Sequence, residues 1–502
     1  MKKYAITWVI CAFAWSLSAG ELPAQGDVRA FSDYLDAKTR TTLEENMIPG
    51  LAVAVLTHGQ VAFSKGYGPQ NSGKPGGINP ETVFNIGSIS KTVAAWGVMR
   101  LVEEGRLNLD EPVQTYLKSW QLPETEFDNK GVTIRRLLSH TAGLSVRGYP
   151  GFQPNEKRPS VIESLLGEAS GSGATAPVKT IMEPGTQWKY AGGGYTLLQL
   201  MIGDVTGMPF ETYMEQKVLK PLGMNSSSYG LPARLESSLA TPYGDFGRQI
   251  ELRRFTAQAA ASLKVSLNDF IRFARASIPK AQGGTGGGGV ISEDTLKSMW
   301  VRPPNSPRYG LGYGVTDTTG GIRVGHGGDN GGWHAQFGVV PHTGDGIIIL
   351  TNSDAGTHIR RSLSCAWRNW QDGTEGDCFK PSLRLSLTRV FTTKGIDAFI
   401  NDCKAAKQNE VFAGQFNEGL LNGFGYSLLQ GGDLVGAVKI FELNVDMYPE
   451  ASNPHDSLGE GYMNQKRYGL AIKHYRKSFE LDPKNNNATK MIAEIERLQA
   501  SH

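Results

Sequence analysis

The sequence predicts an α+β fold: an antiparallel sheet flanked by helices, with a helical subdomain inserted into it, followed by an all-α region. Three observations support this. Short apolar runs separated by glycine-rich turns lie at residues 49–68 and again between residues 308 and 353. Helical periodicity dominates between them. Beyond about residue 375 the strand pattern stops and a helical repeat begins.

The sequence pattern in the first half of the chain predicts the first strands and the inserted helices. Residues 49–68 predict a β-hairpin whose two apolar strands flank a turn at His58-Gly59. An apolar-periodic helix is expected from about Ser88. Further helices are expected at residues 131–144, 195–207, 209–219 and 266–277.

The second half returns to strands. Residues 308–315, 320–328, 333–341 and 345–353 alternate or run apolar between glycine-rich turns. With the hairpin they predict one sheet closed by the two ends of the domain. The run GGTGGGG at residues 283–289 predicts a flexible surface loop.

The C-terminal region contains an internal repeat of 34 residues. Gly425 and Gly459, Ala437 and Ala471, Phe441 and Tyr475, and Pro449 and Pro483 share that offset. A 34-residue period with these residue types is the signature of tetratricopeptide helix pairs. The predicted units span 418–451 and 452–485, and residues 486–498 cap them within a repeat region at 418–500. Residues 376–417 are expected to be a helical linker, or a degenerate first unit at 395–417.

The N-terminus predicts export. Residues 1–20 combine two lysines, an apolar stretch too short to span a bilayer, and Ser18-Ala19-Gly20 before Glu21. An anchoring helix is the alternative. We therefore expect a signal peptide at 1–20, a catalytic domain at 21–375, a periplasmic or secreted location, and no membrane span after cleavage.

The cysteines fit such a compartment without proving it. After removal of Cys11 with the leader, Cys365, Cys378 and Cys403 remain. An oxidising compartment would permit a Cys365–Cys378 disulfide, and free buried thiols are an equal alternative.

The net charge of +3 comes with no run of one sign, so no nucleic-acid partner is expected. None of the histidine spacings matches a metal motif, and no metal or cofactor is expected.

The chemistry begins with Ser88 and Lys91 in the stretch FNIGSISKT. The i, i+3 spacing places both side chains on one face at a helix start. A desolvated lysine can lose its proton near neutral pH and then accept a proton from serine. Ser88 as a plain helix cap is the alternative, and the chance pair Ser277 and Lys280 shows how weak the spacing is alone.

Context strengthens the pair. FNIGSISKT, LLSHTAGL (137–144), PGTQWKYAGGGY (184–195) and GHGGDNGGW (325–333) occur in this order. Together they resemble the serine β-lactamase superfamily in its class C and penicillin-binding branch, which includes D-aminopeptidases, D,D-carboxypeptidases and esterases. The resemblance covers about residues 30–360 and implies the β-lactamase/transpeptidase-like fold.

The resemblance also implies roles by position. Ser88 would be the acylated nucleophile, Lys91 its proton acceptor, and Tyr190 the tyrosine of a YxN motif that shuttles the proton. His326 would take the place of the lysine in a KTG motif. The oxyanion hole would be the backbone N–H groups of Ser88 and Asp329, and the substrate would lie along Gly192, Gly327 and Gly328. Which of Lys91 and Tyr190 is the base stays open.

The remaining residues have ordinary alternatives. Tyr190 alone could be a core aromatic residue, and the glycines after it could serve close packing. His140 in LLSHTAGL is expected to be structural. The repeats could bind a peptide or a protein.

Two departures bear on the substrate. The asparagine of YxN is replaced by Gly192, which removes a group that holds a substrate amide. The lysine of KTG is replaced by His326, which attracts a substrate carboxylate less strongly. We therefore expect a peptidase or esterase acting on D-amino-acid peptides, peptidoglycan-like fragments or small esters. A β-lactamase is the first alternative, and a non-catalytic module that works through the repeats is the second.

Overall fold

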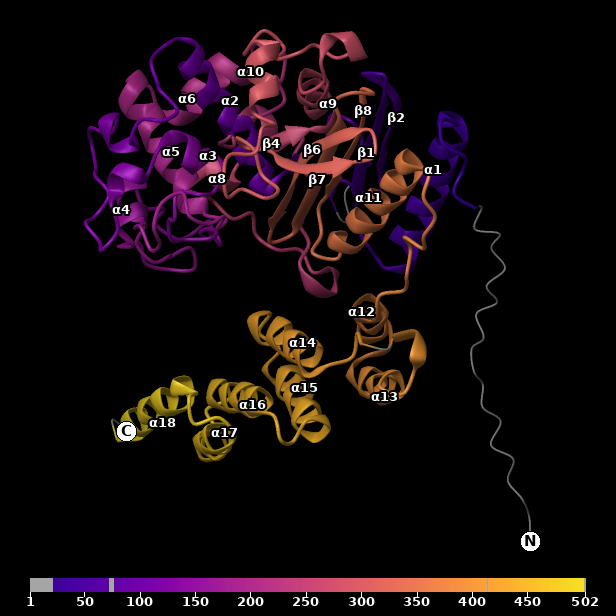
Figure 1. Cartoon of the computed structure of the whole chain (residues 1–502). Coiled ribbons are helices and arrows are strands. Elements are labelled where there is room, and N and C mark those ends of the chain that lie inside the picture. Colours follow the sequence, from indigo (N-terminus) through magenta and orange to yellow (C-terminus); the bar gives the residue numbers. More distant parts are fainter. Residues whose placement is uncertain (1–20, 72–75, 413, 501–502) are drawn as a thin grey trace.

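The computed structural model describes residues 21–500 apart from 72–75 and 413, so the predicted signal peptide lies outside the described residues. The chain forms two bodies (Figure 1). An α+β body contains all the strands, and a helical body begins with α12 (Leu383–Lys394).

The sheet of the α+β body has six antiparallel strands in the order β2-β1-β8-β7-β6-β5. β1 pairs with β8 in the interior of the sheet, so strands from the two ends of the domain meet there, as the sequence predicts. The strands are β1 (Leu51–Thr57), β2 (Gln60–Tyr67), β5 (Gly314–Thr318), β6 (Gly321–Asn330), β7 (Trp333–Val340) and β8 (Asp345–Thr351).

Both faces of the sheet are buried. In β1, Leu51, Val53 and Val55 pack into a core with α1 (Val28–Glu45) and α11 (Gly356–Asp372). The alternate residues Ala52, Ala54 and Leu56 belong to the larger core on the other face, with α2 (Ser90–Glu103) and α9 (Leu267–Ala276). A strand buried on both faces must be apolar throughout, which explains the continuous run LAVAVL.

The helical subdomain lies between β2 and β5 in the sequence and beside the sheet (Figure 1). A second, two-stranded sheet, which the sequence did not suggest, pairs β3 with β4. The elements of this part are β3 (Val83–Asn85), α3 (Ile134–Leu138), α4 (Val161–Leu166), α5 (Gly192–Thr206), α6 (Phe210–Met214), α7 (Ala233–Glu236), α8 (Gln258–Ala261), β4 (Lys264–Ser266) and α10 (Glu293–Ser298).

Several predicted boundaries are wrong. The helix expected at 131–144 is only α3, and the strand expected at 308–315 begins at Gly314. Helix α5 starts three residues early, because Gly192, Gly193 and Gly194 are its first turn. The glycine run at 283–289 is not a free surface loop, because a β-carbon on Gly59 of the hairpin turn would lie 2.2 Å from the Gly283 backbone.

The helical body consists of consecutive helices with repeated packing. A β-carbon on Gly425 would lie 2.2 Å from the Phe441 ring, and one on Gly459 would lie 3.0 Å from the Tyr475 ring. The same glycine–aromatic contact therefore recurs after 34 residues. The remaining helices are α13 (Ile396–Ala406), α14 (Glu418–Gln430), α15 (Leu434–Met447), α16 (Ser452–Asn464), α17 (Tyr468–Leu481) and α18 (Asn486–Ala500).

The loop at residues 244–248 of the α+β body packs against the helical body. Phe246 of this loop is buried in the hydrophobic core of the helical body, with its ring centroid 4.6 Å from that of Phe391. Beside it, Asp245 accepts two hydrogen bonds of 2.9 Å from Arg384 on α12 and one from Ser427 on α14. An aromatic anchor and an ion pair therefore hold the helical body against the α+β body.

A disulfide joins Cys365 to Cys378, and Cys403 is a buried free thiol. Phe379 packs on the α1–α11 core, so the α+β body extends a few residues past 375.

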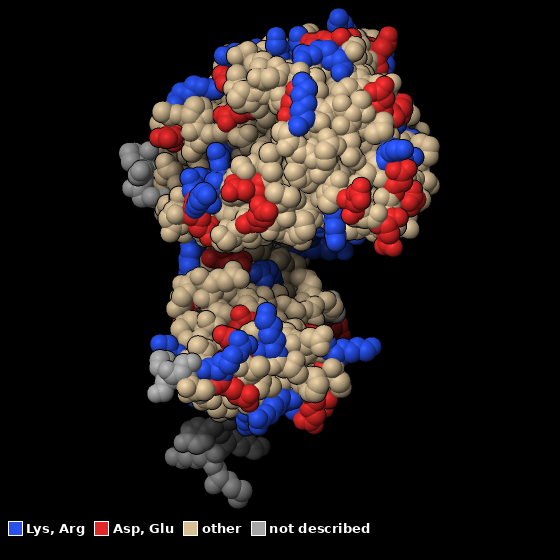
Figure 2. Space-filling model, turned by 90° about the vertical axis from the view of Figure 1, so that its left-hand side faces the viewer, with Lys and Arg blue, Asp and Glu red and all other residues tan. Residues whose placement is uncertain are grey.

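Lysine, arginine and acidic side chains are intermingled on the face that Figure 2 shows. In the part of the chain that the structure describes, no helix is both long and apolar enough to cross a membrane.

Candidate active site

Ser88 lies in the 3-10 turn η1 (Gly87–Ile89), directly before α2. The Asn85 side chain accepts a hydrogen bond of 2.8 Å from the Gly87 N–H and fixes the entry to this turn. Gly87 has φ +51, and a β-carbon there would lie 2.7 Å from the backbone nitrogen of Asp329. Glycine before the serine therefore allows both the left-handed backbone and the close approach of β6.

Lys91 lies one turn further on and points back to Ser88. Its side chain is buried, with 2% of the residue exposed, and Nζ lies 3.1 Å from Ser88 Oγ. Nζ also donates a hydrogen bond of 2.7 Å to the Ala260 carbonyl in α8. Among the described residues no carboxylate forms an ion pair with Lys91. The predicted contact between the two side chains is present, and Lys91 is not a surface charge.

Tyr190 reaches the same place from the segment before α5. Lys91 Nζ lies 5.0 Å from the centre of the Tyr190 ring, and the His326 ring lies 6.3 Å from it on another side. The Tyr190 hydroxyl is buried and has no hydrogen-bond partner. The structure thus brings Tyr190 into the cluster without a hydrogen bond to Ser88 or Lys91. An unpaired buried hydroxyl of this kind is available to a substrate or to water.

His140 supports the backbone on both sides of Tyr190. It has φ +61, an uncommon conformation outside glycine. Its carbonyl accepts from the Lys189 N–H at 2.8 Å, and its Nδ1 accepts from the Ala191 N–H at 3.2 Å. Burial, and then the charge of Lys91, lower the pKa of His140 well below its usual value. This neutral, buried imidazole fits the structural role expected for it.

His326 lies in β6 with its ring turned into the site. Nδ1 lies 2.5 Å from the Gly327 carbonyl, so Nδ1 carries the hydrogen and donates it, which leaves the lone pair on Nε2. Nε2 is buried and has no partner. Burial, with a further contribution from a positive charge on Lys91, lowers the pKa of His326 to about 4. At neutral pH this position therefore offers an uncharged acceptor.

The outer edge of β6 faces Ser88. β5 pairs with β6 only as far as Gly325, so the edge from His326 onward is covered by no strand in the described chain. A β-carbon on Gly328 would lie 1.9 Å from the Ile86 carbonyl oxygen and 3.2 Å from the Ser88 nitrogen. The predicted oxyanion donors, the N–H groups of Ser88 and Asp329, therefore come from two segments in direct contact.

Gly192, the first residue of α5, lies under the segment 145–149. A β-carbon on Gly192 would lie 3.0 Å from the Arg147 carbonyl oxygen, which itself accepts from the Gly192 N–H. Gly327 has more room, since its nearest neighbour would be the Gln336 side chain at 3.1 Å. The space of an asparagine side chain at 192 is therefore partly taken by backbone.

The second serine–lysine pair does not form a site. Ser277 is buried and hydrogen-bonded to the Tyr313 hydroxyl at 2.8 Å, whereas the Lys280 side chain is exposed. The described residues also contain no group of three or more histidine, cysteine or acidic side chains that could hold a metal ion.

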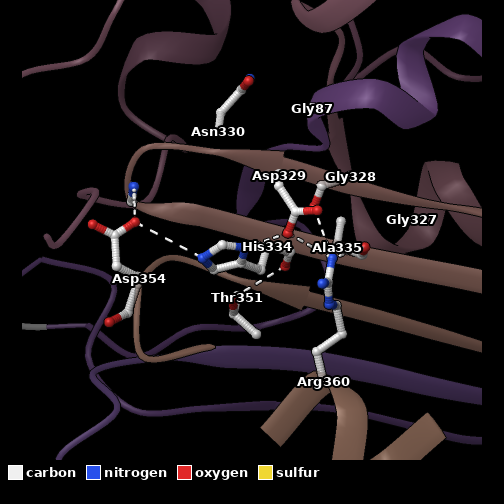
Figure 3. Close-up of polar contacts among 12 residues, drawn as sticks. Gly87, Gly327, Gly328, Asp329, Asn330, His334, Ala335, Thr351, Asp354 and Arg360 are labelled. Carbon is white, nitrogen blue, oxygen red and sulfur yellow. Dashed lines mark hydrogen bonds and ion pairs between the residues drawn. The ribbon is translucent and has the colours of Figure 1, made fainter. Parts of the chain in front are cut away.

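Sequence reasoning missed several neighbours of the site. Trp188 and Tyr309 complete the aromatic cluster around His140, and Arg360 of α11 reaches the strand that carries Asp329 (Figure 3). Trp188 is two residues before Tyr190, so its place could have been inferred. Nothing in the sequence near Arg360 points to a strand 31 residues earlier.

These features define a class of protein. The family model described as Beta-lactamase matches residues 35–364, well over half of the 502-residue chain, and the protein therefore belongs to this family. The match includes every predicted site residue from Ser88 to Asp329.

Two curated proteins show how similar this chain is to known relatives, and one of them is named a putative penicillin-binding protein. The putative penicillin-binding protein PbpX of Bacillus subtilis is 26% identical over 296 residues, which are 55% of this chain and 65% of that protein. Protein flp of Staphylococcus aureus is 27% identical over 198 residues, 39% of this chain and 38% of that protein. The chain thus matches less than two thirds of the length of either relative.

Solved structures confirm the fold. An octameric penicillin-binding protein homologue from Pyrococcus abyssi superposes with a TM-score of 0.56 at 24% identity, covering 72% of this chain and 81% of that one. A β-lactamase/D-alanine carboxypeptidase from Pseudomonas syringae gives 0.53 at 21% identity, covering 68% and 98%. The predicted β-lactamase/transpeptidase-like architecture is therefore confirmed, and at these identities the likeness concerns the fold alone.

Proposed function

We propose that the protein is a serine hydrolase that works through an acyl-enzyme on Ser88. The observation that carries the proposal is the 3.1 Å contact between Ser88 Oγ and the buried Lys91 Nζ. In the neutral form the Lys91 amine accepts the Ser88 proton while Oγ attacks the substrate carbonyl carbon. The carbonyl oxygen becomes an oxyanion between the N–H groups of Ser88 and Asp329.

Collapse of that intermediate breaks the bond to the leaving group, which takes a proton, and leaves the acyl group on Oγ. Water then attacks the acyl carbon, gives up a proton, and releases the acid and free Ser88. We infer that the Tyr190 hydroxyl carries protons in these steps, since it has no hydrogen-bond partner and its ring centre lies 5.0 Å from Lys91 Nζ. Whether Lys91 or Tyr190 takes the first proton is a question for the pH profiles of variants at each position.

We infer that the preferred substrates are uncharged acyl groups and small esters, together with D-amino-acid or peptidoglycan-like peptides, over β-lactams. His326 offers a neutral acceptor where a lysine ammonium would attract a carboxylate. Gly192 carries no side-chain amide to hold a substrate, and a β-carbon there would lie 3.0 Å from the Arg147 carbonyl oxygen. The names of the relatives, a putative penicillin-binding protein and a β-lactamase/D-alanine carboxypeptidase, support the same reaction class. The class C-type branch is proposed on the order of the four sequence motifs.

The test is a panel of chromogenic substrates with full-length mature protein. It contains p-nitrophenyl acetate, its carboxylate-bearing counterpart p-nitrophenyl hemisuccinate, D-alanine p-nitroanilide and nitrocefin. We expect the neutral ester to have the highest kcat/KM and nitrocefin the lowest. Ser88→Ala should lower turnover by about a thousandfold or more, because the acyl-enzyme can no longer form.

Ser277→Ala, from the second serine–lysine pair, is the matched control and should keep wild-type turnover. Nitrocefin turnover that rivals the ester would instead make the protein a β-lactamase. Equal turnover by wild type and Ser88→Ala on every responsive substrate would overturn the proposal.

We also propose that the chain is exported and loses residues 1–20. The Cys365–Cys378 disulfide supports this, because such bonds persist in oxidising compartments. N-terminal sequencing of the protein purified from its native host should begin at Glu21, and an intact Met1 would contradict it.

Residues 418–500 are further proposed to be tetratricopeptide repeats that bind a peptide or a protein. The recurring contacts of Gly425 with Phe441 and of Gly459 with Tyr475 support the repeat assignment. A crystal structure without antiparallel helix pairs at this spacing would refute it.

A further inference from the structure

The peptide group between Gly328 and Asp329 has two ends with different neighbours. The described chain contains no cis peptide bond, so the Gly328 carbonyl and the Asp329 N–H point in opposite directions. Gly328 lies opposite Ala335 of β7, on the inner side of β6. The Asp329 N–H therefore points outward, toward Gly87 and Ser88, where the oxyanion hole is proposed.

Arg360 holds the inner end of this peptide group. It comes from α11 beneath the sheet, and its side chain is only 10% exposed. Its Nη1 atom lies 3.1 Å from the Gly328 carbonyl oxygen, 3.1 Å from the Ala335 carbonyl oxygen and 2.8 Å from the Asp329 carboxylate (Figure 3). A single cation thus binds the carbonyl of the peptide whose N–H faces the site, and ties it to β7.

Hydrogen bonds in series strengthen one another, because a donor on a carbonyl draws electron density from the amide and makes its N–H a better donor. A guanidinium is a stronger donor than a neutral group, and the charge of the buried Arg360 side chain acts on this carbonyl over a short distance. Through the Gly328 carbonyl, Arg360 can polarise the peptide group whose nitrogen, that of Asp329, lies beside Gly87.

The Asp329 carboxylate would oppose an oxyanion if it turned toward Ser88. It is instead paired with Arg360 and with His334 Nδ1 at 2.5 Å (Figure 3). Partial burial alone would raise its pKa, but the hydrogen bond with His334 and the charge of Arg360 hold that pKa below the usual range. His334 is in turn 3.8 Å from Asp354, which accepts the Gly332 N–H of the β6–β7 turn at 2.6 Å.

We propose that Arg360 is a positioning residue for the oxyanion hole: it orients and polarises the Gly328–Asp329 peptide, so that the Asp329 N–H donates more strongly to the oxyanion on the carbon attacked by Ser88. The inference rests on the proposed serine-hydrolase function and adds to it a residue outside the recognised motifs.

The test compares Arg360→Gln and Arg360→Lys with wild type in the full chain. Arg361→Gln is the matched control, an exposed arginine on the same helix. Steady-state kinetics on p-nitrophenyl acetate give kcat and KM separately. The dissociation constant of phenylboronic acid, which forms a tetrahedral adduct on an active serine, reports binding of a transition-state mimic. Thermal unfolding of each variant shows whether it is folded at the assay temperature.

We expect Arg360→Gln to lower kcat about tenfold to hundredfold with little change in KM, and to weaken phenylboronic acid by a similar factor. Arg360→Lys should lower kcat and boronate affinity less than Arg360→Gln does, because the lysine ammonium can still reach one carbonyl. If Arg360→Gln does not fold, the kinetics of Arg360→Lys test the inference instead. A purely structural role would lower Tm and leave kcat and boronate affinity of the folded protein unchanged, which would overturn the inference. Wild-type protein without esterase activity or boronate binding would instead overturn the proposed function, and the inference with it.

Discussion

Replacing Lys91 with methionine is expected to lower kcat/KM on the best ester by about 100-fold to 10,000-fold, the range of a lost general base. Methionine has nearly the length and volume of lysine, so the buried site stays filled. Its thioether cannot accept the Ser88 proton across the 3.1 Å now spanned by Nζ. The folding cost should be small, because the main loss is the hydrogen bond to the Ala260 carbonyl.

Lys280→Met is the control for Lys91→Met. Lys280 occupies the same position in the second serine–lysine pair, but its side chain is exposed and far from any proposed chemistry. It should keep wild-type kinetics. If Lys91→Met kept more than a tenth of the wild-type kcat/KM with a normal unfolding curve, Lys91 would not be the base, and the Tyr190 hydroxyl would become the leading candidate.

Gly328→Ala is expected to lower kcat by about a hundredfold or more and to destabilise the fold by about 1–3 kcal/mol. The added β-carbon would lie 1.9 Å from the Ile86 carbonyl oxygen. Both partners are backbone, so no side chain can rotate away. The strand must separate from η1, and the Asp329 N–H then moves away from Ser88.

Gly338→Ala in the neighbouring strand β7 is the matched comparison. Its nearest new contact would be the Trp367 ring at 3.6 Å, an ordinary van der Waals distance. We expect near-normal kinetics and a Tm within a few degrees of wild type. Wild-type kcat for Gly328→Ala would show that β6 and η1 need not touch for turnover, and would remove Asp329 from the oxyanion hole.

The part of the site that could be predicted from the sequence follows from the spacing of residues close together in the chain. Ser88 and Lys91 are one helical turn apart, so their contact follows from helix geometry. The apolar runs at residues 49–68 and 345–353 predicted a sheet that strands from both ends of the domain close, and β1 does pair with β8. The order of the glycine-flanked motifs then located Tyr190 and His326, which the fold brings within reach of Lys91 and of one another.

What the sequence could not give depends on tertiary contacts. Arg360 looks like one of several polar residues on α11, and only the register of β6 against β7 places it under the Gly328 carbonyl. Helix α5 begins with three glycines, although glycine has low helix propensity. A β-carbon on Gly192 would lie 3.0 Å from the Arg147 carbonyl oxygen, and one on Gly193 would lie 2.9 Å from the Ser145 carbonyl oxygen, so the segment 145–149 crowds the start of this helix. Likewise, β5 starts late because its residues before Gly314 form a bridged turn, Tyr309 to Gly314, instead of a strand.

Phe246 has a consequence for how the two bodies can be separated. Its backbone belongs to the α+β body, but its ring is part of the hydrophobic core of the helical body. A chain cut after Cys378 would leave this aromatic ring facing water and would leave Asp245 without Arg384 and Ser427. The helical body therefore cannot be removed without consequence for the α+β body. Its removal would expose an apolar surface that favours aggregation, and the substitutions Phe246→Ser and Asp245→Asn would make that surface polar and remove the unpaired carboxylate.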